Sequence, residues 1–310
     1  MKAVQFHTTG TPDVLHIEEI DQPQPSEGQV RIRVAGSAVS PADNGIRSGT
    51  LPFPITLPHI PGYDVSGTID AVGAGVDLIV GDEVLGFLPM AENGSAAEFA
   101  IAPAEVLVTA PTSIPLADAA ALPSVALTAW QALFDEAGLE AGQRVLIIGA
   151  GGVVGGYAIQ LAKRAGAHVI ATASGRNRDK VLAAGADEVI DHTEAGVLES
   201  VTEQVDVLLN LAPISPDEFT ALVPLVRDGG FVVATTAWMP APADDARGVR
   251  SAVVFVRSDA DQLRQLVELV DAGELSVEVD RRISLDELKA VHQELADGTL
   301  RGKVVVTPSA

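Results

Sequence analysis

The sequence predicts an α/β protein with a β-rich domain at its two ends and a doubly wound parallel-sheet domain in the middle. Three observations predict this. The first third of the chain is made of short β-rich runs separated by Gly, Pro and Asp. From residue 144 onward, near-continuous apolar runs alternate with amphipathic helical patterns, which is typical of a parallel sheet covered on both faces. The last segment returns to mixed structure, and 310 residues suit two domains.

The N-terminal third should form a small barrel or sandwich, because its apolar runs are short and closely spaced. The expected strands cover residues 2–7, 14–20, 29–40, 65–73, 82–88 and 96–103.

The middle of the chain begins with Ala/Leu-rich helical spacing over residues 115–138, interrupted at Pro123, since proline breaks a helix interior. An alternation of strands and helices follows. Strands are expected at 144–149, 168–174, 187–192, 205–212 and 231–237, and helices at 153–166, 178–185 and 217–230.

The C-terminal part reads as a strand, a helix, a strand, a helix and a last strand, over residues 252–256, 261–273, 276–283, 285–298 and 303–308. We expect residues 1–118 and 274–310 to form the β-rich domain and residues 119–273 the parallel-sheet domain. The apolar strand 252–256 falls near the edge of that sheet. Because an apolar edge strand needs covering, it indicates a homodimer.

The composition limits the partners. Lys and Arg number 20 against 42 Asp and Glu, a formal net charge of −22, which disfavours nucleic acids and anionic membranes. The chain has no cysteine, so disulfides and thiolate zinc sites are excluded. No apolar stretch has the length of a membrane span, which is about 18 residues, and the first residues lack a signal-peptide pattern. A cytoplasmic protein is expected.

The stretch VLIIGAGGVVGG, residues 145–156, has the context of a dinucleotide-binding turn, because a strand enters it and a helix and a second strand follow. Its glycines, Gly149, Gly152 and Gly155, would let a pyrophosphate approach the backbone. The free N–H groups at the helix start, including Val153 and Val154, would bind it. The middle domain is therefore expected to be a Rossmann domain; a tight turn without a ligand is the alternative.

The end of the second strand of this unit reads Ser174, Gly175, Arg176, Asn177 and Arg178, where a carboxylate would hold the ribose of NAD. Guanidinium groups suit a 2′-phosphate because they offer planar, permanently charged donors. NADP(H) is therefore the expected cofactor, unless the arginines only solvate the next helix.

The order of several motifs resembles the medium-chain dehydrogenase/reductase superfamily, in particular its zinc-independent quinone oxidoreductase branch. The motifs are GSAVSPADNGIRSG (36–49), IPGYDVSGTIDAVGAGV (60–76), GDEVLGF (81–87), ALPSVALTAWQAL (121–133), the glycine turn and RGKVVV (301–306). The resemblance covers nearly the whole chain. It implies a GroES-like catalytic domain interrupted by a Rossmann domain, and a glycine spacing in which Gly149 stands where the branch has alanine.

The resemblance also implies that zinc is absent. At the positions that match the zinc ligands of related enzymes, this chain has Ser40, Tyr63 and Ser124, which are poor zinc ligands. The expected reaction is hydride transfer from NADPH to a quinone or an α,β-unsaturated carbonyl compound, a small-molecule substrate. A dedicated enoyl reductase of a biosynthetic pathway and an NADPH-binding protein without significant turnover remain alternatives.

The resemblance suggests individual roles as well. Tyr63 is the candidate catalytic hydrogen-bond or proton donor, with half-buried packing as the alternative. Ser40 and Asn44 lie on the first active-site loop and would contact substrate, or cap a helix. Where the quinone reductase pattern has a tyrosine in this loop, the chain has Gly45, so no role carries over.

Three further residues are expected to contact the cofactor. Thr128 matches a family position that lies over it. His192 matches a position beside the adenosine 2′-phosphate, and Lys303 is placed to reach the cofactor cleft. Solvated or core positions are the alternatives for all three.

Overall fold

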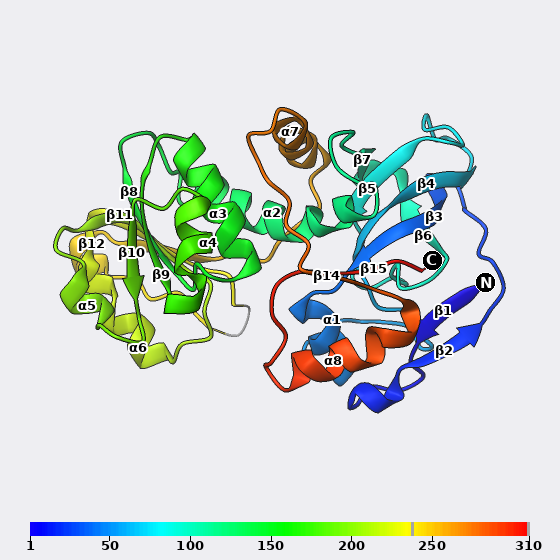
Figure 1. Ribbon diagram of the computed structural model, residues 1–310, viewed down its shortest axis with the longest axis horizontal. Helices are drawn as coiled ribbons and strands as arrows, with labels where there is room; N and C mark the ends of the chain where they lie inside the picture. Colours follow the sequence, from blue (N-terminus) through cyan, green and yellow to red (C-terminus); the bar gives the residue numbers. More distant parts are fainter. Residues whose placement is uncertain (237–238, 309–310) are drawn as a thin grey trace. The chain divides into compact units, whose positions relative to one another are not determined.

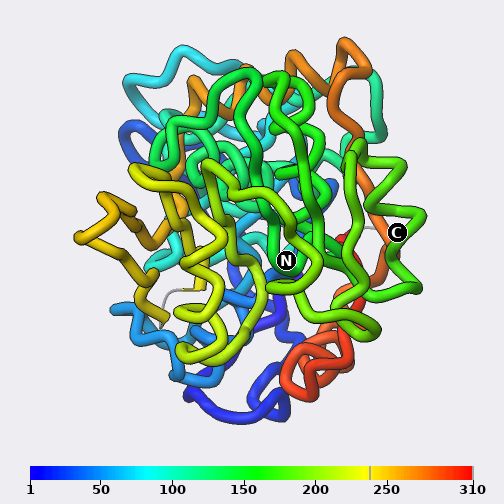
Figure 2. The backbone as a smooth tube through the Cα atoms, turned by 90° about the vertical axis from the view of Figure 1, so that its left-hand side faces the viewer, coloured from blue at the N-terminus to red at the C-terminus, as the bar shows by residue number. Residues whose placement is uncertain are grey.

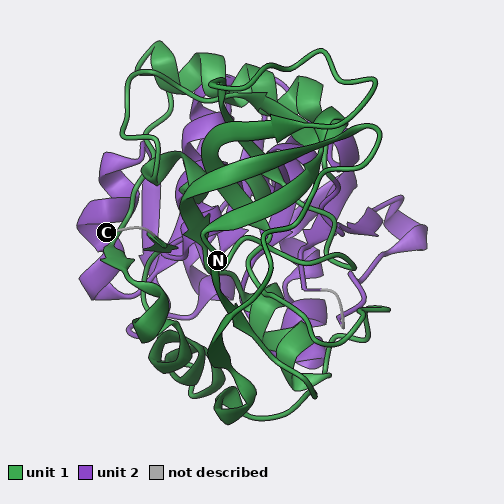
Figure 3. Cartoon of the chain, turned by 90° about the vertical axis from the view of Figure 1, so that its right-hand side faces the viewer, with its two compact units in different colours: residues 1–124, 258–310 green, residues 125–257 purple. Residues whose placement is uncertain are grey.

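The computed structural model describes residues 1–236 and 239–308. The chain divides into two compact units, residues 1–124 with 258–310 (unit 1) and residues 125–257 (unit 2) (Figure 3).

Unit 2 is built on a parallel sheet whose strands are ordered β10-β9-β8-β11-β12-β13. The strands span Arg144–Ile148 (β8), His168–Ala173 (β9), Glu188–Asp191 (β10), Val205–Asn210 (β11), Val226–Ala234 (β12) and Arg250–Val253 (β13). In this order the chain grows outward in one direction from β8 and then, after a crossover, in the other from β11. That is the doubly wound arrangement of a Rossmann domain, so the predicted fold class is confirmed.

Helices cover both faces of this sheet, as Figure 1 shows. They span Val153–Arg164 (α3), Arg178–Ala183 (α4), Val197–Ser200 (α5) and Pro216–Ala221 (α6). Helices α3 and α4 pack against β8, β9 and β10. A core cluster that includes Ile148, Leu208 and Phe219 of α6, with Val197 of α5 against it, fills the space on one side of the sheet. Figure 2 follows the same succession of strands and helices along the backbone tube, from green to yellow.

Unit 1 contains an antiparallel sheet in the order β14-β15-β3-β4-β5-β7, with β6 also paired to β3, and a separate β1-β2 ribbon; within the sheet, only β14 and β15 pair in parallel. The strands span Lys2–Gln5 (β1), His16–Glu19 (β2), Gln29–Ala38 (β3), Asp64–Val72 (β4), Glu83–Phe87 (β5), Phe99–Pro103 (β6), Leu107–Thr109 (β7), Arg281–Ile283 (β14) and Val304–Val306 (β15). Alternate residues of β3, such as Val30 and Ile32, form its core with Val65 and Val84.

The helices of unit 1 are Pro41–Ser48 (α1), Ala260–Asp271 (α7) and Leu288–Ala296 (α8), while α2, Pro123–Trp130, carries the chain from unit 1 into unit 2. The predicted domain limits, 118/119 and 273/274, differ from this division. Helix α7 belongs to unit 1 because it packs against β7, and its Asp271 accepts hydrogen bonds from the backbone N–H groups of Thr112 and Ser113.

The structure corrects several expected elements. Residues 41–48, expected as a loop, form α1, and the strand expected at 252–256 ends at Val253. The helix expected at 217–230 ends at Ala221, and residues 226–230 belong to β12. The final residue of the strand expected at 231–237 lies outside the described residues.

Candidate functional site

The glycine turn follows β8 at the point where the strand order reverses, between β8 and β11, which is where open α/β sheets bind ligands. Gly149 has a left-handed φ of 78° and lies against Ala212, so a side chain there would be strained. The backbone N–H of Gly149 donates to Thr172 Oγ1 at 3.0 Å, and that of Ala150 donates to the Thr172 carbonyl at 3.0 Å. The neighbouring strand β9 therefore holds the turn in place.

Helix α3 starts directly after this turn, with exposed Gly152 as its N-cap and Val153 and Val154 as its first residues. No side chain of the described residues caps this helix start, so its first N–H groups remain available to an anion. Gly155 has a packing role: a Cβ there would lie 2.3 Å from the Ala150 carbonyl oxygen. The turn has the open backbone and the helix start that a pyrophosphate requires.

The second part of the predicted cofactor site lies at the carboxyl ends of β9 and β10. Ala173 pairs with Asp191, so the segments that begin with Ser174 and His192 leave the sheet side by side. Arg176, Arg178 and His192 are exposed. The Arg178 guanidinium donates to the Val189 carbonyl at 3.2 Å, which orients it along β10. The structure thus brings the residues that are predicted to bind the 2′-phosphate together at the carboxyl ends of β9 and β10.

Sequence reasoning missed two residues here. A Cβ on Gly151 would lie 2.6 Å from Asn177 Nδ2, so Asn177 links the segment after β9 to the glycine turn. A Cβ on Gly175 would lie 2.9 Å from Asp191 Oδ2. A carboxylate therefore lies beside the end of β9, but it comes from the neighbouring strand β10, which spacing along the chain does not reveal.

The remaining residue predicted in unit 2, Thr128, lies half-buried on α2. The predicted residues Ser40, Asn44, Tyr63 and Lys303 all belong to unit 1.

Ser40 caps α1 through Asp43. The backbone N–H and the hydroxyl of Ser40 donate to Asp43 Oδ2 at 2.7 and 2.9 Å, and the Gly62 N–H donates to Oδ1 at 2.7 Å. Burial raises the pKa of Asp43 to about 6, although the hydrogen bonds from Gly62 and Ser40 act in the opposite direction. Asp43 therefore fastens the start of α1 to the segment that carries Tyr63.

Asn44 is positioned by Arg47, one turn further along α1. The buried guanidinium of Arg47 donates to Asn44 Oδ1 and to the Gly10 carbonyl. With its amide oxygen fixed in this way, half-buried Asn44 has both amide N–H groups available as donors among the described residues. Gly45 packs closely, since a Cβ there would lie 2.9 Å from Leu51 Cβ, which leaves no room for the tyrosine of the quinone reductase pattern.

Tyr63 is buried, with 2% of its surface exposed, and its hydroxyl lies 2.9 Å from His59 Nε2. Burial lowers the pKa of His59 to about 4, although a hydrogen bond with the Thr56 backbone acts in the opposite direction, so the ring is neutral at pH 7. With the other ring N–H directed to the Thr56 backbone, Nε2 accepts a hydrogen bond from the Tyr63 hydroxyl. Burial, and next the Asp43 carboxylate, raise the pKa of Tyr63 above its usual value. A catalytic role for Tyr63 stays a prediction.

Ser124 and Lys303 meet at Asp64, a buried carboxylate at the start of β4. The backbone N–H and the hydroxyl of Ser124 donate to Asp64 at 2.7 and 2.6 Å. The Lys303 ammonium lies 3.1 Å from Asp64 Oδ2 and also donates to the Val39 carbonyl. This buried ion pair occupies the ammonium within unit 1, and a contact between Lys303 and the cofactor stays a prediction.

The residues at the zinc-ligand positions do not fit a zinc ion. Ser40, Tyr63 and Ser124 offer only hydroxyl groups, and each hydroxyl is hydrogen-bonded to a neighbouring side chain. Within residues 1–236 and 239–308, no cluster of three or more His, Cys, Asp or Glu side chains has a metal-binding arrangement. In the same residues, no helix combines the length and apolar character needed to cross a membrane.

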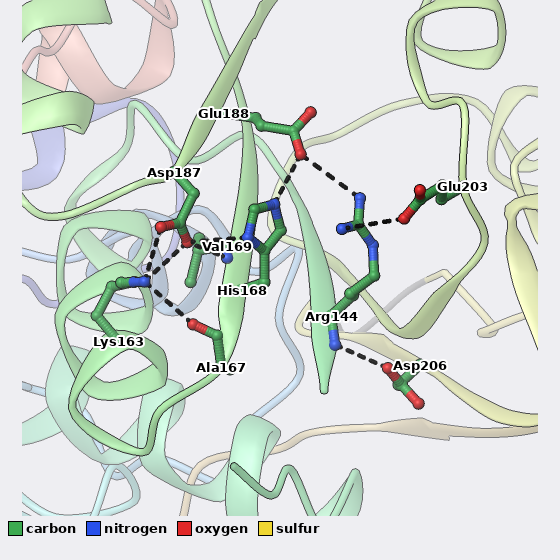
Figure 4. Close-up of polar contacts among 9 residues, drawn as sticks. All are labelled: Arg144, Lys163, Ala167, His168, Val169, Asp187, Glu188, Glu203 and Asp206. Atoms are coloured by element: carbon green, nitrogen blue, oxygen red, sulfur yellow. Dashed lines mark hydrogen bonds and ion pairs between the residues drawn. The ribbon is translucent and has the colours of Figure 1, made fainter. Parts of the chain in front are cut away.

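A network of charged side chains lies at the amino ends of the strands of the unit 2 sheet, opposite the glycine turn (Figure 4). His168 Nε2 lies 2.7 Å from Glu188, and the Lys163 ammonium lies 2.8 Å from Asp187. Arg144 bridges Glu188 and Glu203 at 3.5 and 3.4 Å. These side chains pair with one another where the strands start. The network therefore stabilises the end of the sheet that is farther from the glycine turn.

Two family descriptions match the chain. "Alcohol dehydrogenase GroES-like domain" matches residues 26–112, in unit 1, and "Zinc-binding dehydrogenase" matches residues 184–306.

Curated relatives extend over the full length. The chain is 33% identical to the chloroplast envelope quinone oxidoreductase homolog of Arabidopsis thaliana, covering 99% of this chain and 98% of that protein. It is 33% identical to the chloroplastic NADPH-dependent alkenal/one oxidoreductase of Arabidopsis thaliana, covering 99% and 80%. The solved structure of the quinone oxidoreductase from Coxiella burnetii superposes with a TM-score of 0.90 at 29% identity, covering 100% and 99%.

Proposed function

Because the chain belongs to the quinone oxidoreductase branch of the medium-chain dehydrogenase/reductase superfamily, we propose that it reduces quinones or α,β-unsaturated carbonyl compounds with NADPH and without zinc. The observation that carries the cofactor assignment is the meeting of two features in unit 2. The uncapped start of α3 offers N–H groups to a pyrophosphate. Arg176 and Arg178 offer positive charge to a 2′-phosphate, and the exposed His192 ring offers a further hydrogen-bonding group beside them.

The nicotinamide cofactor, when bound, supplies the hydride; the chain's own residues must bind it and stabilise the charge that forms on the acceptor. We assign the pyrophosphate to Gly149, Gly152, Val153, Val154 and Gly155. Ser174, Arg176, Arg178 and His192 are assigned to the adenosine ribose and its phosphate, and Thr128 and Lys303 are further cofactor contacts.

In unit 1, Asn44 is the residue best prepared to stabilise an acceptor oxygen. Reduction of a conjugated carbonyl places negative charge on its oxygen, and an amide donor with a fixed orientation stabilises that charge without reorganising. Arg47 fixes the Asn44 amide oxygen, so the N–H groups keep one orientation. Ser40 and Tyr63 are further proposed substrate contacts, and the hydroxyl proton of each would have to turn from its present acceptor, Asp43 or His59, to donate to a substrate.

The proposed absence of zinc is supported by the reaction and by the side chains at the positions that match zinc ligands. A Lewis acid is needed chiefly to acidify an alcohol, whereas a conjugated acceptor already delocalises the developing charge. The hydroxyl groups of Ser40, Tyr63 and Ser124 are not ligands that zinc prefers, and their hydrogen-bond partners compete for them.

We also propose a homodimer formed through β13. This strand is the last in the sheet order. Its final residue, Val253, and Phe255 just after it have exposed apolar side chains. Pairing with a second copy would cover this edge. The cytoplasmic location stays a prediction, because the relatives include chloroplast and mitochondrial proteins.

Steady-state kinetics with NADPH and NADH on a panel of quinones and enones tests the function. We expect turnover with at least one conjugated acceptor and a higher kcat/KM for NADPH. Turnover restricted to one enoyl thioester would favour a dedicated enoyl reductase. Tight NADPH binding with no acceptor reduced would favour a binding protein and contradict the proposal.

A further inference from the structure

Asp191 places a negative charge beside the segment that we propose to hold the 2′-phosphate, and this inference rests on that proposed site. Asp191 ends β10 opposite Ala173 of β9. One of its oxygens accepts from the Thr193 backbone N–H at 3.0 Å and from the Thr193 hydroxyl at 2.6 Å. The other lies 2.9 Å from the position that a Cβ on Gly175 would occupy. The carboxylate thus lies between the segments that follow β9 and β10.

The absence of a side chain at Gly175 lets the carboxylate lie this close. A Cβ there would lie 2.9 Å from Asp191 Oδ2, so the carboxylate would have to move away. The backbone N–H of Gly175 also stabilises the charged carboxylate. The hydrogen bonds from Thr193, then the neighbouring His192, and last the hydrogen bond from Gly175 lower the pKa of Asp191 below its usual value, so Asp191 is an anion at neutral pH.

We propose that Asp191 is a specificity-determining residue that weakens binding of the cofactor 2′-phosphate by placing a fixed negative charge next to it. Two exposed arginines, Arg176 and Arg178, attract a dianion to the carboxyl ends of β9 and β10, where His192 is also exposed, and Asp191 opposes the arginines. In addition, Asp191 accepts hydrogen bonds from Gly175 and Thr193, and these donors are then less available to a phosphate. The balance of the two effects sets the preference between NADPH and NADH.

The test is calorimetric titration of the full chain with adenosine 2′,5′-bisphosphate and with AMP, which needs no turnover. The measured quantity is the ratio of the Kd for AMP to the Kd for the bisphosphate. Asp191→Asn removes the charge and keeps one acceptor oxygen for Thr193. It should raise this ratio about three- to tenfold, the size of one carboxylate–phosphate repulsion near a protein surface. The gain should shrink as salt is added.

Two further variants make the result decisive. Asp191→Ser removes the charge with a smaller side chain and should raise the ratio in the same direction. Glu203→Gln is the control, because it also removes one negative charge but at the amino ends of the strands, where Glu203 contacts Arg144 (Figure 4). It should leave the ratio unchanged. Thermal melts of each variant show whether the fold is kept.

The outcomes separate the two proposals. A wild-type ratio above one that Asp191→Asn and Asp191→Ser leave unchanged overturns the role of Asp191 and keeps the proposed 2′-phosphate site. A wild-type ratio of one that rises in the Asp191 variants overturns the NADPH preference of the natural chain and supports the role of Asp191. Ratios of one throughout overturn both.

Discussion

Asp43 is a buried carboxylate whose hydrogen bonds join α1 to the segment before β4. Burial raises its pKa to about 6 from an ordinary 3.8. An acid whose pKa is higher in the folded state binds more protons when folded. Its contribution to stability is therefore present below pH 3.8 and is lost as the pH rises through about 6.

Asp43→Asn removes this titration. We expect the free energy of unfolding of the wild type to fall relative to that of the variant as the pH rises from 4 to 7. Urea denaturation of both proteins at each pH measures the difference. A difference that stays constant over this range would show that Asp43 titrates like an ordinary carboxyl group.

The guanidinium of Arg178 is proposed to contact the 2′-phosphate of the cofactor. Its guanidinium is already oriented by the Val189 carbonyl, so little ordering is needed when a phosphate binds. Arg178→Ala should weaken NADPH binding by about 1.5–3 kcal/mol, the value of a hydrogen bond between charged groups, and leave NADH binding unchanged.

Fluorescence titration with both cofactors measures this effect. Arg264→Ala is a matched control, because Arg264 is an exposed arginine of α7 in unit 1 that pairs only locally with Asp261 among the described ion pairs. An equal loss of NADPH and NADH binding in Arg178→Ala would show that Arg178 supports the fold of the segment and does not contact the phosphate.

Individual residues also show where sequence reasoning stops. Arg176 and Arg178 after β9 could be identified as candidate phosphate-binding residues from their residue type and their distance along the chain from the glycine turn. His192 after β10 could be identified from the family resemblance. The partner of Tyr63 could not be identified, since His59 has no motif and meets the hydroxyl only through the folded segment. Asp191 was missed for the same reason, because it reaches Gly175 from a neighbouring strand.

Among the elements, the turn from β8 into α3 makes a steric demand that a single substitution can test. Gly155 and Gly156 are adjacent in α3, yet a Cβ on Gly155 would lie 2.3 Å from the Ala150 carbonyl oxygen, whereas a Cβ on Gly156 meets nothing within 4 Å. The two glycines therefore have different reasons to be there, and they offer a matched pair of substitutions.

Gly155→Ala should destabilise the protein by about 1–3 kcal/mol, as overpacking does, and weaken NADPH binding because the turn must shift. Gly156→Ala should stabilise it by about 0.5–1 kcal/mol, since alanine is the better helix former. Chemical denaturation and NADPH titration of both variants give the comparison. Equal effects of the two substitutions would contradict the close packing of the turn.

The elements themselves were largely predictable, because apolar runs and amphipathic spacing determine strands and helices locally. The strand–turn–helix unit around Gly149 was identified in this way and is confirmed as part of a Rossmann domain. Residues 41–48 were expected as a loop because the family resemblance places the first active-site loop there, with a capped helix as the alternative for its polar residues. The Ser40–Asp43 cap of α1 is local in sequence. The contacts of Arg47 with the Gly10 carbonyl and of Gly62 with Asp43 join distant segments, which only the fold provides.

For the whole molecule, the open edge of the unit 2 sheet predicts association. Val253 on β13 is 39% exposed, and its strand has a partner, β12, on one side among the described strands. We expect analytical ultracentrifugation to show a species of twice the chain mass, and Val253→Lys to shift it to the monomer. Ile79→Lys, a substitution of an exposed apolar residue in unit 1, should leave the dimer intact.

A monomeric wild type would contradict the proposed interface, and so would a dimer that Ile79→Lys dissociates while Val253→Lys does not. The sequence indicated the edge from the apolar residues near 252–256, but the register that leaves Val253 exposed depends on pairing between Ala234 and Val253.

In the proposed reaction, the enzyme transfers a hydride from the cofactor to a conjugated acceptor. Its most direct test is to supply NADPH deuterated at the reactive C4 position together with an α,β-unsaturated ketone and to locate the label in the product by NMR. We predict one deuterium at the β-carbon, with NADPH consumed in equal amount. A reduced product without deuterium, or no consumption of NADPH with any quinone or enone, would contradict the account.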